Sequence, residues 1–263
     1  MHLLGIASTG LPEFPTFIQL LLEYVLSERW MHFILPWEDV IFSAIIAVLI
    51  SLVCYLGTKK REIIPHGLQN FLELFVENLR KVAKTILGDD ADQHVPFLGS
   101  LFIYILVMNV FGLIPFLKSP SSSVNISIGM ALVVFVRVQY LNVKNMGFFG
   151  YIYHMSGSPQ NLIGWILVPL MLPIELITQI ARPITLALRL TGNVMGEHAL
   201  VSIFALFAVV IFTFDLLPIG LPIQLPAMLF GLLTSVMQAL VFTLLSTIYI
   251  LLSIPHKSET HST

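Results

Sequence analysis

Hydrophobic positions in this chain form long runs that short polar segments separate. The first run covers residues 39–58, which is close to the length of about 20 residues that a helix needs to cross a bilayer. Two runs, near 96–117 and 124–140, predict a transmembrane hairpin over residues 96–142, and a last pair occupies residues 161–254. The pattern therefore predicts an all-α, polytopic membrane protein with about five crossings.

Residues 68–87 show a different pattern, in which apolar residues recur with helical spacing and polar residues fill the remaining positions. This pattern predicts an amphipathic helix at the membrane interface, within a cytoplasmic segment 59–95. Gly88 and the aspartates after it are expected to end the helix. The apolar positions are Leu68, Phe71, Leu72, Phe75, Leu79, Val82 and Ile86.

Basic residues suggest how the chain is oriented. Lys59, Lys60 and Arg61 follow the first span, and the positive-inside tendency places them in the cytoplasm. The N-terminal segment 1–38, which shows no cleavable export signal, is then external. Loop 143–160 and tail 255–263 are then cytoplasmic, while Lys118 in an expected external turn is a single exception.

The composition requires lipid as the solvent for most of the chain. Of the 263 residues, 57% are hydrophobic and 11% are charged, whereas soluble domains carry about 25% charged residues. The mean hydropathy is +0.90. A net charge of -2 gives no basic excess, so no nucleic-acid partner is expected. The single cysteine, Cys54, excludes an internal disulfide framework and a multi-thiolate metal site, and we expect no cofactor.

The apolar stretch from Asn161 to Phe214 is too long for a simple crossing. As one helix it would extend about 80 Å, against about 30 Å of hydrocarbon. The helix must therefore break, with Pro169, Pro173 or Pro183 as candidates, or lie steeply tilted.

Four charged residues lie within that stretch, each of which costs about 2.5 to 3.5 kcal/mol at mid-bilayer. They are Glu175, Arg182, Arg189 and Glu197. At about 100° per residue, a polar stripe lies within about 40° of Arg189, with Glu197 about 80° and His198 about 180° away. The stripe contains Glu175, Thr178, Arg182, Thr185, Asn193 and Gly196.

These charges have a structural and a functional interpretation. Glu175 and Arg182 could pair with each other and hold helices together. Arg189 has no acid three or four residues away on its own helix, so its counter-ion must come from another helix or another chain. Because arginine keeps its charge at any accessible pH, it suits a permanent electrostatic element better than a proton carrier.

A weaker polar line follows in the last run, where Gly231, Thr234 and Tyr249 fall within about 40° of Gln238. Such residues often only bond to a neighbouring helix. Glu197 and His198 together could relay protons, because an imidazole titrates near neutrality. A structural role for His198 remains the alternative.

The run from Arg182 to Asn193, Arg-Pro-Ile-Thr-Leu-Ala-Leu-Arg-Leu-Thr-Gly-Asn, resembles subunit a of the membrane sector of F-type rotary ATP synthases. Pro-Ile-Glu175 upstream, Asn109-Val-Phe-Gly-Leu-Ile-Pro115, and the stretch from Gln238 to Tyr249 extend the resemblance over most of the chain. The resemblance implies two long, steeply tilted helices that face a ring of c subunits and carry two aqueous half-channels.

The resemblance also implies site residues. Arg189 takes the place of the family's essential arginine, with Asn193 and Gln238 as polar neighbours at the ring. Glu175 would be an acid of one half-channel, and His198, beside Glu197, takes a position that the family fills with Glu or His. Ser123 departs from the pattern, because many members have an acid there. The remaining candidates along the proton path are Tyr249, Arg182, Thr185, and Asp39 or Asp215 as a replacement for the missing acid.

The function that the resemblance implies is that of a proton-translocating stator subunit in a bacterial inner membrane. Its partners would be the c ring, the peripheral-stalk subunit b and the rest of the synthase, which must carry the phosphate chemistry because no nucleotide-binding glycine loop is present here. One alternative is a self-contained ion or solute transporter, although no internal repeat is evident. A membrane hydrolase is a weaker one, because Gly157-Ser158 lacks nucleophile-elbow spacing and no His-Glu-x-x-His motif occurs.

Overall fold

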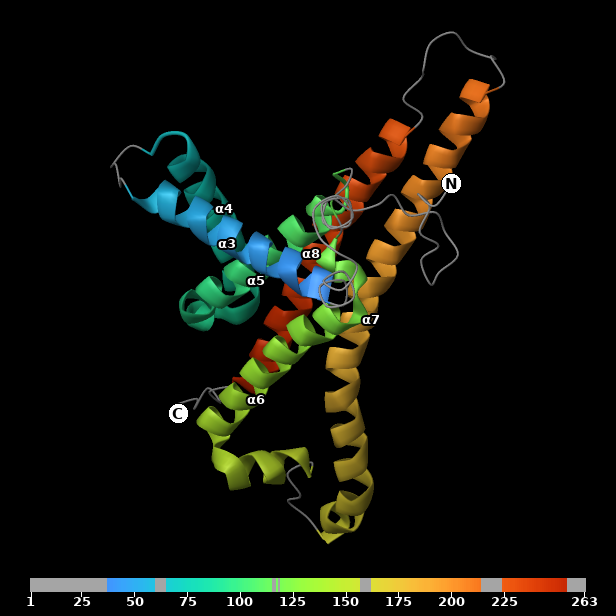
Figure 1. Cartoon of the computed structure of the whole chain (residues 1–263). Coiled ribbons are helices and arrows are strands. Elements are labelled where there is room, and N and C mark those ends of the chain that lie inside the picture. Colours follow the sequence, from blue (N-terminus) through green and yellow to red (C-terminus); the bar gives the residue numbers. More distant parts are fainter. Residues whose placement is uncertain are drawn as a thin grey trace.

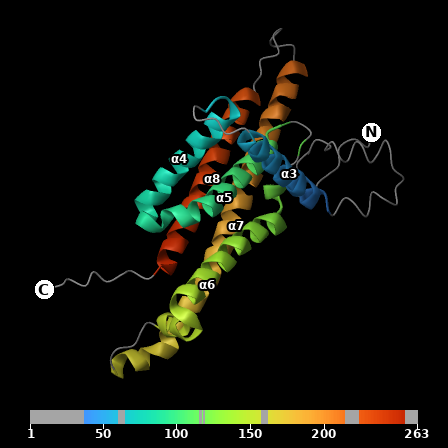
Figure 2. The same cartoon turned by 90° about the vertical axis from the view of Figure 1, so that its left-hand side faces the viewer.

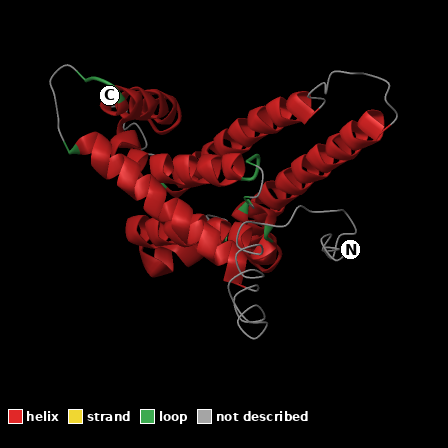
Figure 3. Ribbon diagram, turned by 45° about the horizontal axis from the view of Figure 1, so that its top comes forward, coloured by secondary structure: helices red, strands yellow, loops and turns green. Residues whose placement is uncertain are grey.

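Every regular element that the structure describes is helical (Figure 3). The computed structural model describes residues 37–59, 65–114, 117, 119–156, 162–213 and 224–254. The predicted all-α fold is confirmed within these ranges. The predictions on the external segment 1–36, the tail 255–263, Lys118 and Asp215 lie outside the described residues.

The helices match a chain that crosses a membrane several times. Five segments are long and apolar enough to cross, namely Glu38–Thr58, Leu68–Phe111, Val124–Gly147, Val168–Phe204 and Leu225–Ser253. The prediction of a polytopic membrane protein is thereby confirmed. The described elements are α3 (Glu38–Thr58), α4 (Leu68–Leu87), the short 3-10 helix η2 (Gly88–Asp90), α5 (Ala91–Phe111), the 3-10 helix η3 (Pro120–Ser122), α6 (Val124–Met155), α7 (Leu162–Thr213) and α8 (Gln224–Ser253).

Helix α8 is the centre of the packing. It contacts α4, α5, α6 and α7, and α6 packs along α7 as well (Figures 1 and 2). Helix α3 crosses α5 on the side away from α7 (Figure 2). The shared core contains apolar side chains from five helices, including Leu98, Ile105, Val134, Leu190 and Phe242. The long helix α7 is therefore covered on one side by α6 and α8 and bare on the other.

Helix α4 has the bounds that its amphipathic pattern predicts, 68–87, and Gly88 follows it with a φ of 63° that favours glycine. Its inward face packs on α5, where the rings of Phe75 and Phe102 lie 5.3 Å apart. At its C-terminal half, Arg80 donates two hydrogen bonds of 2.7 Å to Asp92 at the start of α5. The two helices are thus joined by apolar packing and a bidentate ion pair.

Helix α7 is one continuous helix of 52 residues, about 78 Å at 1.5 Å per residue. Of the two expectations for this stretch, the break is wrong, because the helix continues through Pro169, Pro173 and Pro183. Each proline removes one backbone hydrogen bond, and the remaining bonds carry the helix past it. Figure 1 shows the C-terminal part of α7 running beside α8, while α6 packs against α7 as well.

Several boundaries differ from the predicted ones. Helix α5 begins at Ala91, five residues before Pro96. Helix α6 continues past residue 142 and is helical to Met155, so the first part of the expected loop 143–160 is helical. The residues after Gly147 form a second helical segment. The two segments meet at Gly147, whose φ of 71° and ψ of 162° are not helical. Such a backbone is open almost only to glycine, so Gly147 turns the chain without ending its helical character.

We expect Gly147→Ala to destabilise the protein by about 1 to 3 kcal/mol, because a side chain at this backbone conformation is strained. The measurement is the temperature at which the detergent-solubilised protein aggregates. Gly129→Ala is the matched control, since it lies on the same helix and a Cβ there would meet nothing within 4 Å. Equal stability of the two variants would contradict the assigned role of Gly147.

Candidate functional site

The two polar lines predicted on separate stretches face each other across α7 and α8. The side-chain amide of Asn193 donates a 2.6 Å hydrogen bond to Oε1 of Gln238. Further along, the guanidinium carbon of Arg182 lies 5.3 Å from the centre of the Tyr249 ring. Residue numbers rise along one helix as they fall along the other, as an antiparallel pair requires. The structure therefore brings four of the predicted site residues together in two contacts.

Glu197 makes a third contact between these helices. Its side chain is 6% exposed, and Oε2 accepts a hydrogen bond of 3.5 Å from Ser235 on α8. A Cβ built on Gly231 would lie 2.8 Å from Oε1 of Glu197 and 2.6 Å from Cδ2 of Leu113. Gly231 thus leaves the space that the carboxyl group of Glu197 fills. A glycine stands on the polar line of α8 because a side chain would collide there, and not because it supplies a polar group.

His198 points to another side of α7, toward the end of α5. A Cβ built on Gly112 would lie 2.9 Å from Nε2 of His198 and 2.5 Å from Cβ of Ser119. This agrees with the helical count that places His198 opposite Arg189. Glu197 and His198 are therefore adjacent in sequence but face different helices, α8 and α5.

Next to His198 lies a buried polar cluster that the sequence analysis missed. Ser119 and Ser121 are 0% exposed, although the segment from Lys118 to Ser123 reads as a polar external turn. Ser121 donates to Oδ1 of Asn109 over 2.6 Å, and the hydroxyls of Ser119 and Ser121 lie 2.7 Å apart. An asparagine inside an apolar run was the signal available, because a buried amide requires polar partners.

Arg189 lies on the exposed side of α7, between the levels of Asn193 and Arg182. Within the part of the chain that the structure describes, it makes no ion pair, hydrogen bond or cation–π contact. Ile184 and Leu188, close to Arg189 along the helix, are exposed apolar residues. A permanent cation thus lies on the exposed face of a helix of membrane-spanning length.

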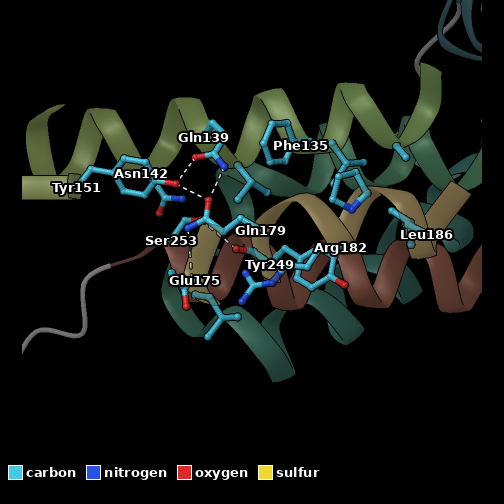
Figure 4. A pocket seen from close by; sticks show the side chains of 15 residues that line it. Phe135, Gln139, Asn142, Tyr151, Glu175, Gln179, Arg182, Leu186, Tyr249 and Ser253 are labelled. Atoms are coloured by element: carbon cyan, nitrogen blue, oxygen red, sulfur yellow. Dashed lines mark hydrogen bonds between the residues drawn. The ribbon is translucent and has the colours of Figure 1, made fainter. Parts of the chain in front are cut away.

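A cavity of about 180 Å³ lies between α6, α7 and α8 near the other end of the stripe (Figure 4). Glu175 and Arg182 both line it, but within the described residues they are not an ion pair. Arg182 lies over Tyr249 instead, and Oε1 of Glu175 accepts a 3.4 Å hydrogen bond from Gln179. The structural interpretation, in which these two charges simply pair, is not what the geometry shows.

The secondary candidates occupy less informative places. The hydroxyl of Thr185 donates to backbone carbonyls of its own helix, at 2.9 Å from Ala181. Asp39 lies half-buried in the first turn of α3, beside Glu38, which is 3% exposed. Glu38 is an acid that the sequence analysis did not select, and α3 contacts η3 next to Ser123.

Arg137 on α6 is another charge that the sequence analysis passed over. Its guanidinium carbon lies 5.7 Å from the centre of the Phe97 ring on α5. A charged residue inside the apolar run 124–140 was the available signal. Arg137 joins α5 to α6 inside the bundle, which distinguishes it from the exposed Arg189.

The fold and this site define a polytopic helical membrane protein with polar side chains in contact between α7 and α8 and, beside them, an arginine that has no partner among the described residues. The family model described as ATP synthase A chain matches residues 40–251. The chain belongs to this family. The resemblance to subunit a seen in the sequence is thereby confirmed.

Individual relatives agree with the family assignment. ATP synthase subunit a of Protochlamydia amoebophila (strain UWE25) is 51% identical over 95% of this chain and 92% of that protein. The subunit a of Solidesulfovibrio magneticus is 39% identical over 83% of this chain and 85% of that protein. The subunit a of Aliarcobacter butzleri is 33% identical over 85% of this chain and 92% of that protein.

Taking Glu197 as the proton-path acid that the sequence predicts, we expect Gly231→Ala to lower ATP-driven proton pumping by about ten- to a hundredfold, because a displacement of about 1 Å at such a group can cost about that much. The added Cβ would collide with the carboxyl group of Glu197 and with Cδ2 of Leu113. Pumping is measured in inverted membrane vesicles. The double variant Gly231→Ala with Glu197→Asp, whose carboxyl is withdrawn by one methylene, is expected to recover part of the activity. Full activity of Gly231→Ala would show that the carboxyl position does not matter.

Proposed function

We propose that this chain is the proton-translocating stator subunit of an ATP synthase and that Arg189 is its essential cation. Family membership supports the role of a proton-translocating subunit that works with the rest of the synthase. The single observation that supports the assignment of Arg189 is its exposed position on α7 without a partner among the described residues. A charge in that setting requires a compensating group from outside the described part of the chain.

The compensating group is a carboxylate on a rotating ring of c subunits. A protonated carboxyl group can face lipid, whereas an ionised one is costly there. As a ring carboxyl reaches Arg189, the positive charge stabilises its ionised form and the proton leaves. The fixed charge of Arg189 also repels protons in a narrow path, so it prevents a direct leak between the two sides.

Two half-channels would bring protons to the ring and carry them away. Glu197 and His198 form the external one, beside the cluster of Asn109 and the buried serines, with Asp39 or Asp215 as a further acid. Glu175, Arg182 and Tyr249 line the cytoplasmic one. Asn193 and Gln238 lie between the two and, with Thr185, form the polar surface next to Arg189.

This assignment fixes an orientation in a bacterial inner membrane. The N-terminus lies outside and the C-terminus in the cytoplasm, so the cavity at Glu175 opens toward the cytoplasm. Each charge that moves through 100 mV releases about 2.3 kcal/mol, so several must cross for each ATP that partner subunits make. The peripheral-stalk subunit b would hold this chain against the torque of the ring.

A self-contained solute transporter is the rival function. Such proteins bind their substrates where broken helices expose backbone groups near mid-membrane. Helix α7 is continuous over all its 52 residues, and the cavity lies toward one end of the polar stripe rather than at a helix break. The geometry therefore favours a path along a helix pair over a central binding site.

We expect Arg189→Ala to abolish coupled proton pumping while the complex still assembles, because the ring carboxyl would lose the cation that stabilises its ionised form. ATP-driven pumping in inverted vesicles is the measurement, with subunit content determined on the same membranes. The control is Lys81→Ala, which removes a charge from an exposed ion pair with Glu77 on α4; exposed pairs of this kind contribute little to stability. Near-normal pumping by Arg189→Ala would refute its assigned role.

For His198 we expect the Ala variant to change the shape of the pH profile of pumping, because a residue that carries protons titrates within the working range. The measurement is the initial pumping rate between about pH 6 and 9. A profile of unchanged shape with a uniformly lower rate would indicate that His198 only packs against Gly112.

A further inference from the structure

The second segment of α6 returns to the polar cavity between α6, α7 and α8. Gly147 turns the chain, and the helical segment that follows runs back in the direction of the N-terminal part of α7 (Figure 1). Tyr151 on this segment lines the cavity together with Gln139 from the first segment and Gln179 from α7. Residues from both sides of the Gly147 turn therefore meet at one point.

At that point the hydroxyl of Tyr151 lies between two amides. Its oxygen is 2.5 Å from Oε1 of Gln139 and 2.5 Å from Oε1 of Gln179 (Figure 4). The amide of Gln139 also donates to Oε1 of Gln179 over 2.7 Å. A phenol has a single proton to donate, so Tyr151 serves one of the two amide oxygens at a time.

These donors fix the orientation of the Gln179 amide. Because Oε1 faces Tyr151 and Gln139, the nitrogen on the other side of the group is directed to Glu175, whose Oε1 lies 3.4 Å away. If the amide were reversed, its oxygen would face the Glu175 carboxylate and two acceptors would oppose each other. The hydroxyl of Tyr151 and the amide of Gln139 thus together determine which atom of Gln179 the carboxylate meets.

We propose that Tyr151 is a positioning residue for proton transfer at Glu175, acting through Gln179 across the turn at Gly147. The inference rests on the proposed function of Glu175 as an acid of the cytoplasmic half-channel. Tyr151 touches neither the carboxylate nor the ring. It holds the amide that donates to the carboxylate, so the geometry of the acid depends on a segment outside the two long helices.

The cavity has the size that such a step needs. Its volume of about 180 Å³ is large enough to hold several water molecules beside its polar side chains. The titratable groups that face it are Tyr151 from α6, Glu175 and Arg182 from α7, and Tyr249 from α8. In addition, Pro183 has no N–H to donate to the backbone carbonyl of Gln179, which leaves an acceptor at the same place.

The test compares proton pumping by assembled ATP synthase in inverted vesicles. Tyr151→Phe keeps the ring and removes the donor, and we expect pumping to fall about fivefold, the population change that loss of one neutral hydrogen bond produces. Gln179→Met, similar in length, is expected to give a similar loss. Because the two residues act in one chain, the double variant is expected to lose no more than either single variant. The matched control is Tyr140→Phe on α6, an exposed tyrosine that does not line the cavity.

Two further measurements distinguish a positioning role of Tyr151 from a packing role, and a failure of this inference from a failure of the proposed function. Tyr151→p-aminophenylalanine restores a donor at the same place and is expected to restore pumping, with equal amounts of assembled complex in all membranes. Unchanged pumping by Tyr151→Phe, or independent losses that multiply to about 25-fold in the double variant, would overturn the inference. If Tyr151→Phe fails to assemble, Gln179→Met alone carries the test, and normal pumping by it overturns the inference. Arg189→Ala, measured alongside, reports on the proposed function separately.

Discussion

The arrangement around α7 depends on positive charges that lipid cannot solvate. The charged residues on this helix differ in the partners that the structure gives them. Arg182 lies over an aromatic ring, and Glu197 is enclosed between α7 and α8 with a hydroxyl as its donor. Arg189 has neither kind of partner within the described chain. Among the described residues, the polar groups of α7 therefore have partners on the side of α8, whereas Arg189 has none on its own side.

Helix α8 makes this arrangement possible because its own polar groups are satisfied locally. Thr243, Ser246 and Thr247 are buried and donate to carbonyls four residues earlier in the same helix. They add no unpaired donors to the interior. Gln238 is different, because it is 2% exposed, accepts a bond from Asn193 and has an Nε2 without a partner among the described groups.

Glycines set the distances along the proposed proton path. Gly231 admits the carboxyl group of Glu197 into the interface with α8, and Gly112 admits the ring of His198 beside Ser119. Two titratable groups on neighbouring residues are thereby held against different helices. At the other end, Gly147 acts through its backbone conformation and brings Tyr151 back to the Gln139–Gln179 amide pair. Polar groups are thus brought together by close packing at Gly112 and Gly231 and by a turn of the chain at Gly147. The long helices alone could not bring these groups together.

The sequence alone determined the helical class, the number of crossings, the bounds of α4 and the two polar lines, because hydrophobic runs and helical periodicity are local properties. It also singled out Arg189, since the absence of a nearby acid on one helix can be counted. Only the tertiary structure decided that Arg182 lies over Tyr249 instead of pairing with Glu175, that the serines of an apparent turn are buried, and that Tyr151 reaches Gln179. These contacts join residues far apart in the chain, and their partners depend on how helices pack and where a single glycine turns the backbone, which no local pattern records.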